Sequence, residues 1–439
     1  MTDRASIFET IQIGVETIPG TAVPALKKLQ SLGIEPAARL EVNKFRAMGN
    51  KFPSLVVPGK EWVAAKVSGL ATYTEIIYAL SSVLGYAAPV QQGGTAAYQW
   101  VHAPHTSSPD AVKTFTVEQG SYLRAHRFTN GLITSFGVKY SREAIELSGE
   151  MIGRSLEDKI HLSQNAKYTL TAGGSPPTAG NFTLTFGGQT TANIAYNATP
   201  AQVQTALEAL STIGAGNVEV VATVAQGVGN LSVAGNVYTV EFVKDLAQAP
   251  QALTGTFSGL TPPDSITLAS AVIGTAPSSV DLVPVLPTEI DIYLTDTYGD
   301  LATAQPLSRV LSAEWNVSDR FGPLFPLRSS YGVGFASTVE IEPALEAKLV
   351  MEADDEGMAL LNTARKGDTK FMRIEAVGDA IEDPYYYLFR TDMALKVSDV
   401  GDFRDEDGVF AIEWMLTGVH DPTWGKAIEV TVINDLSAL

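Results

Sequence analysis

The stretch IGVETIPGTAVPALKKL, residues 13–29, has a counterpart late in the chain, YLTDTYGDLATAQPLSR at residues 293–309. Both run from a short apolar strand through an acidic residue and a threonine into a turn. At a constant spacing of 280 residues, four positions carry identical or similar residues: Glu9, Glu16, Thr17 and Ala22 fall on Glu289, Asp296, Thr297 and Ala302. A repeat that keeps order and spacing indicates a duplicated unit.

The duplication extends to a predicted helix in each copy. TYTEIIYALSSVLG (72–85) and DDEGMALLNTARKG (354–367) each begin with a capping residue, Thr72 or Asp354, and end at a glycine. Beyond the helices, FGVKY (136–140) falls on LKVSD (395–399), and IELSGEM (145–151) falls on FAIEWML (410–416). The shorter spacing there indicates about twenty extra residues in the first copy, which we place in a loop from 86 to 110.

A zone of different composition separates the copies. It has only 7 charged residues in 114 and is bounded by two Gly-, Pro- and Ser-rich segments that look like linkers, TAGGSPPTAGN and GTAPSSVDLVPVLP. Alternating strands are predicted at 182–186, 190–196, 217–224 and 236–243, with a helix from Thr199 to Gly214. The sequence therefore predicts three domains, at residues 1–165, 166–280 and 281–439.

Composition limits the classes of function. The chain has no cysteine, and MTDRASIFET at its start lacks the apolar core of a signal peptide, so we expect a soluble protein from a reducing compartment, with no membrane. Only 18% of the residues are charged and 45% are hydrophobic, which favours some surface buried against other chains.

Charge is placed unevenly along the chain. The net charge of −18 divides into +2 for residues 1–165, −3 for 166–279 and −17 for 280–439. Such a balance argues against a protein that holds nucleic acid, because affinity for a phosphate backbone comes largely from clustered Lys and Arg.

The sequence shows no convincing site for chemistry. His102 and His105 lie in a Pro-containing segment without a carboxylate cluster, which favours a surface loop over a metal site. The acidic run DFRDEDG (402–408) has Trp414 where a calcium loop needs a glutamate, so we expect a polar hairpin turn. Phosphate-binding and nucleophile motifs are absent. We expect no enzyme, no cofactor and no metal.

Two strands near equivalent ends of the copies alternate between polar and apolar residues. The apolar set predicts a core: Ile145, Leu147, Phe410, Ile412, Trp414 and Leu416. The polar set predicts a face in water: Lys139, Arg142, Glu146, Ser148, Glu150, Lys396, Ser398 and Glu413. An ordinary half-buried antiparallel sheet would explain this pattern. The duplication also allows equivalent hairpins to join edge to edge in a ring, with these polar side chains facing a channel.

Each copy contains a long, apparently irregular segment before its helix: VNKFRAMGNKFPSLVVPGK in the first and NVSDRFGPLFPLRSSYGVGF in the second. Long structureless segments inside compact domains are uncommon and often functional. The segments are basic and aromatic, through Lys44, Phe45, Arg46, Lys51, Phe52 and Lys60, and through Arg320, Phe321 and Arg328. They are either solvated surface loops or arms that dock on an acidic neighbour.

The opening IQIGVETIPGTAVPALKKL, followed by a long loop, a strand, one helix and paired strands ending near Met151, resembles the major tail tube proteins of long-tailed bacteriophages. The resemblance covers residues 1–165 directly and 280–439 through the repeat. The middle zone resembles small domains inserted in phage structural proteins. The fold implied is mainly β: sandwich or barrel tube domains, each with one flanking helix, and a small α+β inserted domain.

The family resemblance implies a function and partners. Family members stack rings whose hairpins form a continuous β-barrel, with the long loop contacting the adjacent ring. Many have one tube domain and form hexameric rings; two domains in one chain imply three subunits with pseudo-sixfold symmetry. Implied partners are further copies, the tape measure protein, tail terminator and tip proteins, and double-stranded DNA passing without specific binding. Implied locations are the virion tail and, during assembly, the host bacterial cytoplasm.

A lumen rich in carboxylates would repel DNA at short range. A second hypothesis is a multidomain β-rich surface-binding or adhesin-like module, whose active part would be the middle domain. Such a module would stay monomeric, whereas a tube protein would form rings or filaments.

Overall fold

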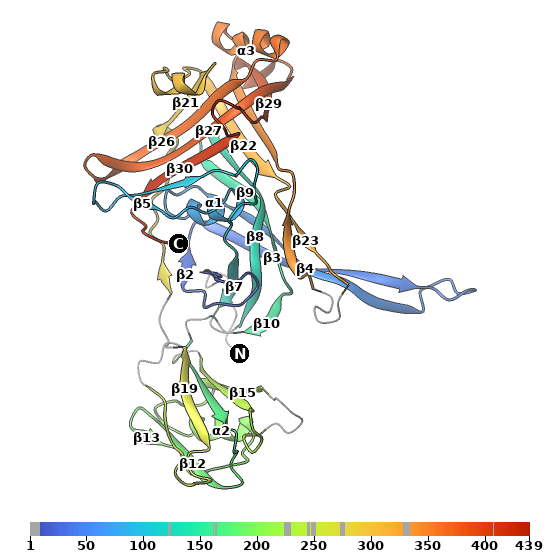
Figure 1. Cartoon of the computed structure of the whole chain (residues 1–439), viewed down its shortest axis with the longest axis vertical. Helices are drawn as coiled ribbons and strands as arrows, with labels where there is room; N and C mark the ends of the chain where they lie inside the picture. The colour runs from blue at the N-terminus through green and yellow to red at the C-terminus, as the bar shows by residue number, and fades with distance from the viewer. Residues whose placement is uncertain are drawn as a thin grey trace.

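The computed structural model describes residues 9–121, 124–160, 162, 165–223, 230–243, 246, 252–272, 277–327, 334–406 and 408–439. The fold is mainly β, as the sequence predicts, with thirty strands and three α-helices in these ranges. In Figure 1 the first copy (blue to green) occupies the middle, the second copy (orange to red) lies above it, and the small domain (green to yellow) hangs below. None of the described helices is long and apolar enough to cross a membrane.

The first copy folds around a fully buried helix. Its elements are β1 (Thr10–Val15), β2 (Lys27–Leu29), β3 (Leu32–Phe45), β4 (Leu55–Leu70), α1 (Ile76–Val83), β5 (Val90–Gln91), β6 (Tyr98–His102), β7 (Phe115–Ser121), β8 (Arg124–Ser141), β9 (Ile145–Gly153) and β10 (Glu157–Ile160). One sheet runs in the order β3, β4, β9, β8, and a second joins β2, β1, β7, β8 and β10. The long strand β8 belongs to both sheets, and every residue of α1 is buried.

The second copy repeats this plan. Its elements are η3 (Pro287–Glu289), β21 (Ile290–Thr295), η4 (Tyr298–Ala302), β22 (Val310–Ser318), β23 (Phe321–Leu324), β24 (Ser337–Glu340), β25 (Ala344–Glu352), α3 (Asp355–Lys366), β26 (Lys370–Glu382), β27 (Tyr385–Val400), β28 (Arg404–Glu406), β29 (Val409–Gly418) and β30 (Ile428–Asn434). Helix α3 begins and ends as predicted: the Asp354 side chain accepts a hydrogen bond from the Gly357 N–H at 2.9 Å, and Gly367 has φ 70°. A left-handed residue of this kind favours glycine.

The pairing of strands demonstrates the duplication more strongly than residue identity does. The pairs β1–β7, β3–β4, β4–β9, β7–β8, β8–β9 and β8–β10 have the counterparts β21–β26, β22–β25, β25–β29, β26–β27, β27–β29 and β27–β30. Both β8–β9 and β27–β29 change register once, next to Ile133 and Val397. Ile133 therefore corresponds to Val397, so the predicted superposition of FGVKY on LKVSD is wrong by about five residues.

The two copies are joined into one body by two sets of strand pairs. Strand β22 pairs with β8, from Ser312 opposite Ser141 to Val317 opposite Phe136. This junction fuses the two four-stranded sheets into one sheet of eight, in the order β3, β4, β9, β8, β22, β25, β29, β27–β28. The extra residues of the first copy, 86–110, were expected to be a loop; they instead contain β5 and β6, and β6 pairs with β30 of the second copy.

The core lies on one face of this sheet. Trp100, Trp315 and Trp414 are fully buried, and so are Ile145, Leu147, Ile412 and Leu416. Phe410 is not: 76% of its surface is exposed, so its predicted place in the core is wrong. Phe410 keeps the parity of Ile412 and Trp414, but it lies opposite Asp405 of the edge strand β28, where no described element covers it.

The middle zone folds around its own core. Its elements are β11 (Lys167–Ala172), β12 (Ala179–Phe186), β13 (Gln189–Thr190), β14 (Ile194–Ala195), α2 (Pro200–Glu208), β15 (Val218–Thr223), β16 (Val237–Phe242), β17 (Thr254–Thr256), β18 (Leu260–Thr261) and β19 (Ile266–Val272). Helix α2 begins at Thr199, whose side chain accepts from the Gln202 N–H. TAGGSPPTAGN, expected to be a linker, connects β11 to β12 inside the domain.

The segment that leads from the middle zone to the second copy is bound to the first copy. Strand β20 (Ser278–Ser279) pairs in parallel with β2. Beyond it, the Tyr73 N–H donates to the Val283 carbonyl at 2.9 Å, and the Thr74 hydroxyl donates to the Asp281 carbonyl at 2.5 Å. This part of GTAPSSVDLVPVLP is therefore held against the body rather than acting as a free linker.

Candidate assembly surfaces

The face of the eight-stranded sheet opposite the core carries alternating charges. Residues that lie opposite each other on neighbouring strands share a face. Glu35 lies opposite Lys66, and Lys66 lies opposite Glu150. Across the junction between the copies, Glu314 lies opposite Lys139 on one side and Lys348 on the other. The two copies therefore place a Glu–Lys pair at equivalent positions, Glu35 with Lys66 and Glu314 with Lys348.

Counted over its strands, this face has a small acidic excess rather than a uniformly acidic character. It carries ten carboxylates and seven cations: Glu35, Glu41, Glu146, Glu150, Glu314, Glu346, Glu352, Asp399, Glu406 and Glu413, and Arg39, Lys60, Lys66, Lys139, Lys348, Lys396 and Arg404. Ion pairs join Lys139 to Glu146 at 3.3 Å, and Glu413 to Lys348 at 2.9 Å and to Arg404 at 2.7 Å. The cations are spread among carboxylates, so the face offers no continuous basic stripe.

Most of the predicted water-facing residues lie on this face. Glu146, Ser148, Glu150, Lys139 and Lys396 are exposed there, and Glu413 is partly covered by its two ion-pair partners. Ser398 lies in the bulge of β27, where its hydroxyl donates to the Met415 carbonyl at 3.1 Å.

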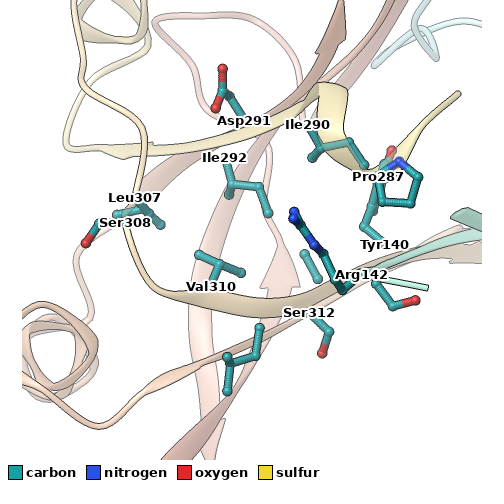
Figure 2. A pocket seen from close by; sticks show the side chains of 13 residues that line it. Tyr140, Arg142, Pro287, Ile290, Asp291, Ile292, Leu307, Ser308, Val310 and Ser312 are labelled. Carbon is teal, nitrogen blue, oxygen red and sulfur yellow. The ribbon is translucent and has the colours of Figure 1, made fainter. Parts of the chain in front are cut away.

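Arg142 lies elsewhere, so its predicted place on this face is wrong. It belongs to the turn between β8 and β9, outside the strand alternation. Figure 2 shows its side chain pointing into a pocket on the core side of the sheet, toward Ile290 and Ile292. The pocket is about 220 Å³ and is lined by the turn residues Ser141 and Arg142 from the first copy and by β21 and β22 from the second.

The eight-stranded sheet has one open edge at each end. At one end β3 pairs with β4, and no described strand pairs with its outer edge. At the other end β28 pairs only with β29 among the described strands. An unpaired row of backbone N–H and C=O groups is a ready template for another strand. Because the sheet is a tandem repeat, its two open edges are equivalent to the two edges already joined by β22 and β8.

A long hairpin extends from one of these open edges. Figure 1 shows β3 and β4 running out of the body as an arm (blue). The segment from 42 to 60, expected to be irregular, forms its outer half: Val42 lies opposite Pro58 and Phe45 opposite Leu55. The pattern was hidden because neither face of the arm packs on a core, so the residues show no polar–apolar alternation.

The arm exposes a set of large apolar side chains together with its basic residues. The exposed fraction reaches 104% for Met48 and 78% for Phe52, and the exposed set is Leu40, Val42, Phe45, Met48, Phe52, Leu55, Val56 and Val57. Lys44, Arg46 and Lys51 lie among them and are exposed. A contiguous apolar surface on a projecting element marks an interaction site. Whether Lys44, Phe45, Arg46, Lys51 and Phe52 contact a neighbouring ring remains a prediction.

The corresponding segment of the second copy is a short hairpin, and Arg320 has a different role from the predicted one. Strands β23 and β24 pair from Phe321 opposite Glu340 to Leu324 opposite Ser337. Arg320 is buried and forms ion pairs with Asp110 and Glu340; its Nε donates to the Val83 carbonyl at 2.9 Å. Phe321 is buried too, and Arg328 lies outside the described residues.

Arg320 therefore connects the two copies through buried ion pairs and does not project from the surface. Asp110 comes from the first copy and Glu340 from the second, more than 200 residues apart. A buried charge needs partners of opposite sign close by. Sequence reasoning missed both partners because no local pattern brings them together.

The candidate chemical residues hold structural positions. His102 was expected in a surface loop; it is buried in β6, where its Nδ1 lies 2.9 Å from the Gly85 carbonyl and burial lowers its pKa to about 4. His105 is exposed, and its Nδ1 lies 2.8 Å from the buried carboxylate of Asp110. The acidic run forms the β28–β29 hairpin, where Gly408 has φ 84°. No group of three or more His, Cys, Asp or Glu among the described residues could hold a metal ion.

Comparisons with known proteins were made on this background. No protein-family model matches the chain, and no curated protein matches it. Among solved structures, it is similar to a chain from Mycobacterium phage Patience, with 10% sequence identity over 54% of this chain and 78% of that one. The TM-score of that match is 0.18, too low to support a conclusion about fold or function.

Proposed function

We propose that this chain is a structural protein of a bacteriophage virion that polymerises, as stacked rings, into a tail tube. The observation that carries the proposal is the eight-stranded sheet, in which two equivalent four-stranded halves are already joined by β8 and β22 and both ends are open. Further copies added at the open ends would continue the same sheet. A closed ring would then leave no sheet edge exposed.

The proposed ring contains three chains. Each chain supplies two copies of the repeat, so three chains supply the six domains expected from the resemblance to tail tube proteins. The two copies carry net charges of +2 and −17, so alternating them places unlike neighbours side by side. Such complementarity favours one alternating arrangement over random association.

In the proposed ring the charged face of the sheet lines the channel. Its carboxylates outnumber its cations, and ion pairs already hold Lys139, Lys348 and Arg404. A DNA duplex would therefore meet a wall with a slight acidic excess and no row of unpaired cations. Screening over about 8 Å at physiological salt would confine the repulsion to the region near the wall. The face suits passage of DNA without specific binding.

The arm is the proposed contact between stacked rings. It projects from the body (Figure 1) and carries exposed Phe45, Met48 and Phe52. Burying these side chains on the next ring would provide the driving force along the tube axis. The tape measure, terminator and tip proteins of a tail would be its further partners, and the small domain would project outward from the tube.

Electron microscopy of the purified protein tests this function. We expect negative-stain images of concentrated protein to show rings and tubes, and light scattering after size exclusion to show trimers before tubes form. A chain that stays monomeric at every concentration would contradict the proposal and favour a monomeric surface-binding module. Rings with six chains would retain the tube but refute the trimer.

A further inference from the structure

We propose that two copies of this chain join by pairing β3 of one with residues 401–406 of the other, in the register that sets Glu35 opposite Arg404. The proposal rests on the self-assembly proposed above and supplies its junction residue by residue. The template is the junction inside the chain, where β22 pairs with β8 and sets Glu314 opposite Lys139.

Strand pairing fixes the equivalence of β3 and β22. Met151 lies opposite Ile133, where β8 changes register, and Leu416 lies opposite Val397, where β27 does. On the other side, Met151 lies opposite Ala65 and Leu416 lies opposite Ala347. Ala347 in turn lies opposite Trp315, and Ala65 lies opposite Pro36. Pro36 therefore corresponds to Trp315, and the glutamates one residue earlier, Glu35 and Glu314, correspond to each other.

The same registers fix the equivalence of the other edge. Lys139 lies opposite Glu146 of β9, and Arg404 lies opposite Ala411 of β29. Glu146 lies five residues before Met151, and Ala411 lies five residues before the equivalent residue Leu416. Arg404 therefore stands where Lys139 stands, and the junction between chains opposes Glu35 to Arg404 as the internal one opposes Glu314 to Lys139. Pro36 has no N–H, so this ladder lacks at most one hydrogen bond.

The apolar residues beside the open edge are uncovered where their counterparts are buried. Phe403 and Phe410 are 59% and 76% exposed. Between Val400 and Arg404 the second copy has one residue more than the first, so Asp402 and Phe403 together take the place of Val138, and Phe410 takes that of Ile145; Val138 and Ile145 are 0% and 2% exposed. At the internal junction β22 lies beside β8, and Val138 lies opposite the buried Trp315. An incoming β3 with its attached core would cover the two phenylalanines in the same way, which removes apolar surface from water.

A third observation is a pocket that lacks its cap. The pocket in Figure 2 is lined by Ile290, Leu311 and Ser312 of the second copy and also by Ser141 and Arg142 of the first. The equivalent hollow of the first copy is lined by Thr10, Leu32 and Gly33, with Glu9 and Lys28 on its walls. Among the described residues, this hollow has no lining residue from a turn equivalent to the one between β8 and β9. In the proposed register Glu406 takes the place of Ser141 at its mouth.

Disulfide trapping tests the register, because the chain has no native cysteine. Chains with Glu35→Cys are mixed with chains with Arg404→Cys, allowed to assemble and oxidised. Side chains opposite each other on antiparallel strands have Cβ atoms about 4.5–5.5 Å apart, close enough for a disulfide after small adjustments. We expect covalent dimers. In the matched control, Asp405→Cys replaces Arg404→Cys; Asp405 is the next residue of β28 and lies opposite Phe410, so its side chain lies on the other face of the strand, and we expect at least tenfold less dimer.

The double variant Glu35→Cys/Arg404→Cys then shows how many chains close the ring. We expect a ladder on non-reducing gels that ends at the trimer, and Glu314→Cys/Lys139→Cys should form the equivalent bond within one chain as a positive control. Tubes that form without a 35–404 link, or with equal linking in the Asp405 control, would overturn the register while leaving the function standing. Linked trimers that never stack would support the register and contradict the tube function. A mixture that neither links nor assembles would contradict both proposals.

Discussion

The first and second copies share one plan of strand pairs but treat their edges differently. In the first copy the β8 edge is covered by β22, so Val138 and Ile145 are buried. In the second copy the equivalent edge at β28 is open, and Phe403 and Phe410 are exposed. We attribute the exposure of these phenylalanines to the missing neighbouring strand, because the strand pairs around them otherwise follow the plan of the first copy.

The copies also differ in what grows from the equivalent of β3. In the first copy β3 and β4 continue outward as the arm with its exposed apolar side chains. In the second copy the chain turns after β22 into the short β23–β24 hairpin, and Arg320 is buried between the copies. In the first copy this place therefore carries a projecting arm, whereas in the second copy it carries a short hairpin beside Arg320, which connects the two copies.

Removing the arm should have the largest effect. Glu41 lies opposite Lys60, so residues 42–59 can be replaced by an Asn-Gly turn that keeps the strand register. We expect rings to form and tubes to be lost, because the apolar contact between rings is gone while the ring junctions stay. Electron microscopy measures this result, and thermal unfolding should show a melting temperature within a few degrees of wild type. Tubes of normal length would refute the role of the arm.

Trp414→Ala should destabilise the free subunit by about 3–5 kcal/mol, the usual cost of emptying a large buried aromatic site. Trp414 is fully buried, and its indole N–H donates to the Gly357 carbonyl at 3.0 Å. Urea unfolding at a concentration that keeps the chain monomeric measures the change.

Phe410→Ala is the matched control on the same strand. It should change the stability of the monomer by less than about 1 kcal/mol, because exposed positions contribute little. It should nevertheless weaken ring formation, in which this side chain becomes covered. A large loss of monomer stability would show that Phe410 is part of the core after all.

Acid should weaken the first copy through His102. The unfolded chain binds a proton at this residue near pH 6.5, whereas burial lowers the pKa of folded His102 to about 4. Stability is therefore full above pH 6.5 and falls as the pH drops from 6.5 to 4, by about 3 kcal/mol in all. His102→Gln should flatten this part of the pH profile of urea midpoints. An unchanged slope would show that folding does not lower the pKa of His102.

Removing the small domain should have the smallest effect on assembly. Its core is separate from that of the two copies, and the return connection is pinned from Ser278 onward. Replacing residues 166–276 by a short Gly/Ser linker should leave rings, tubes and the melting temperature of the body unchanged. Loss of assembly with an intact body would place the small domain in the ring contacts.

Local sequence patterns determined the mainly β fold, the caps of α2 and α3 and the duplication. These features depend on residues close in sequence: the side chains of Thr199 and Asp354 each accept a hydrogen bond from the N–H group three residues further along and so complete their own helix ends. Alternation in β9 and β29 likewise sorted Ile145 and Trp414 to one face and Glu146 and Glu413 to the other.

Tertiary structure decided what each of those faces and segments meets. Parity placed Phe410 on the core face, but only the position of β28 at the end of the sheet leaves it uncovered. Charge suggested an outward role for Arg320, but Asp110 and Glu340 bury it between the copies. The arm gave no strand signal, because its backbone is satisfied by its own hairpin partner and neither face packs on a core. Secondary structure follows from neighbours in sequence, whereas burial and edges depend on which distant strands arrive beside them.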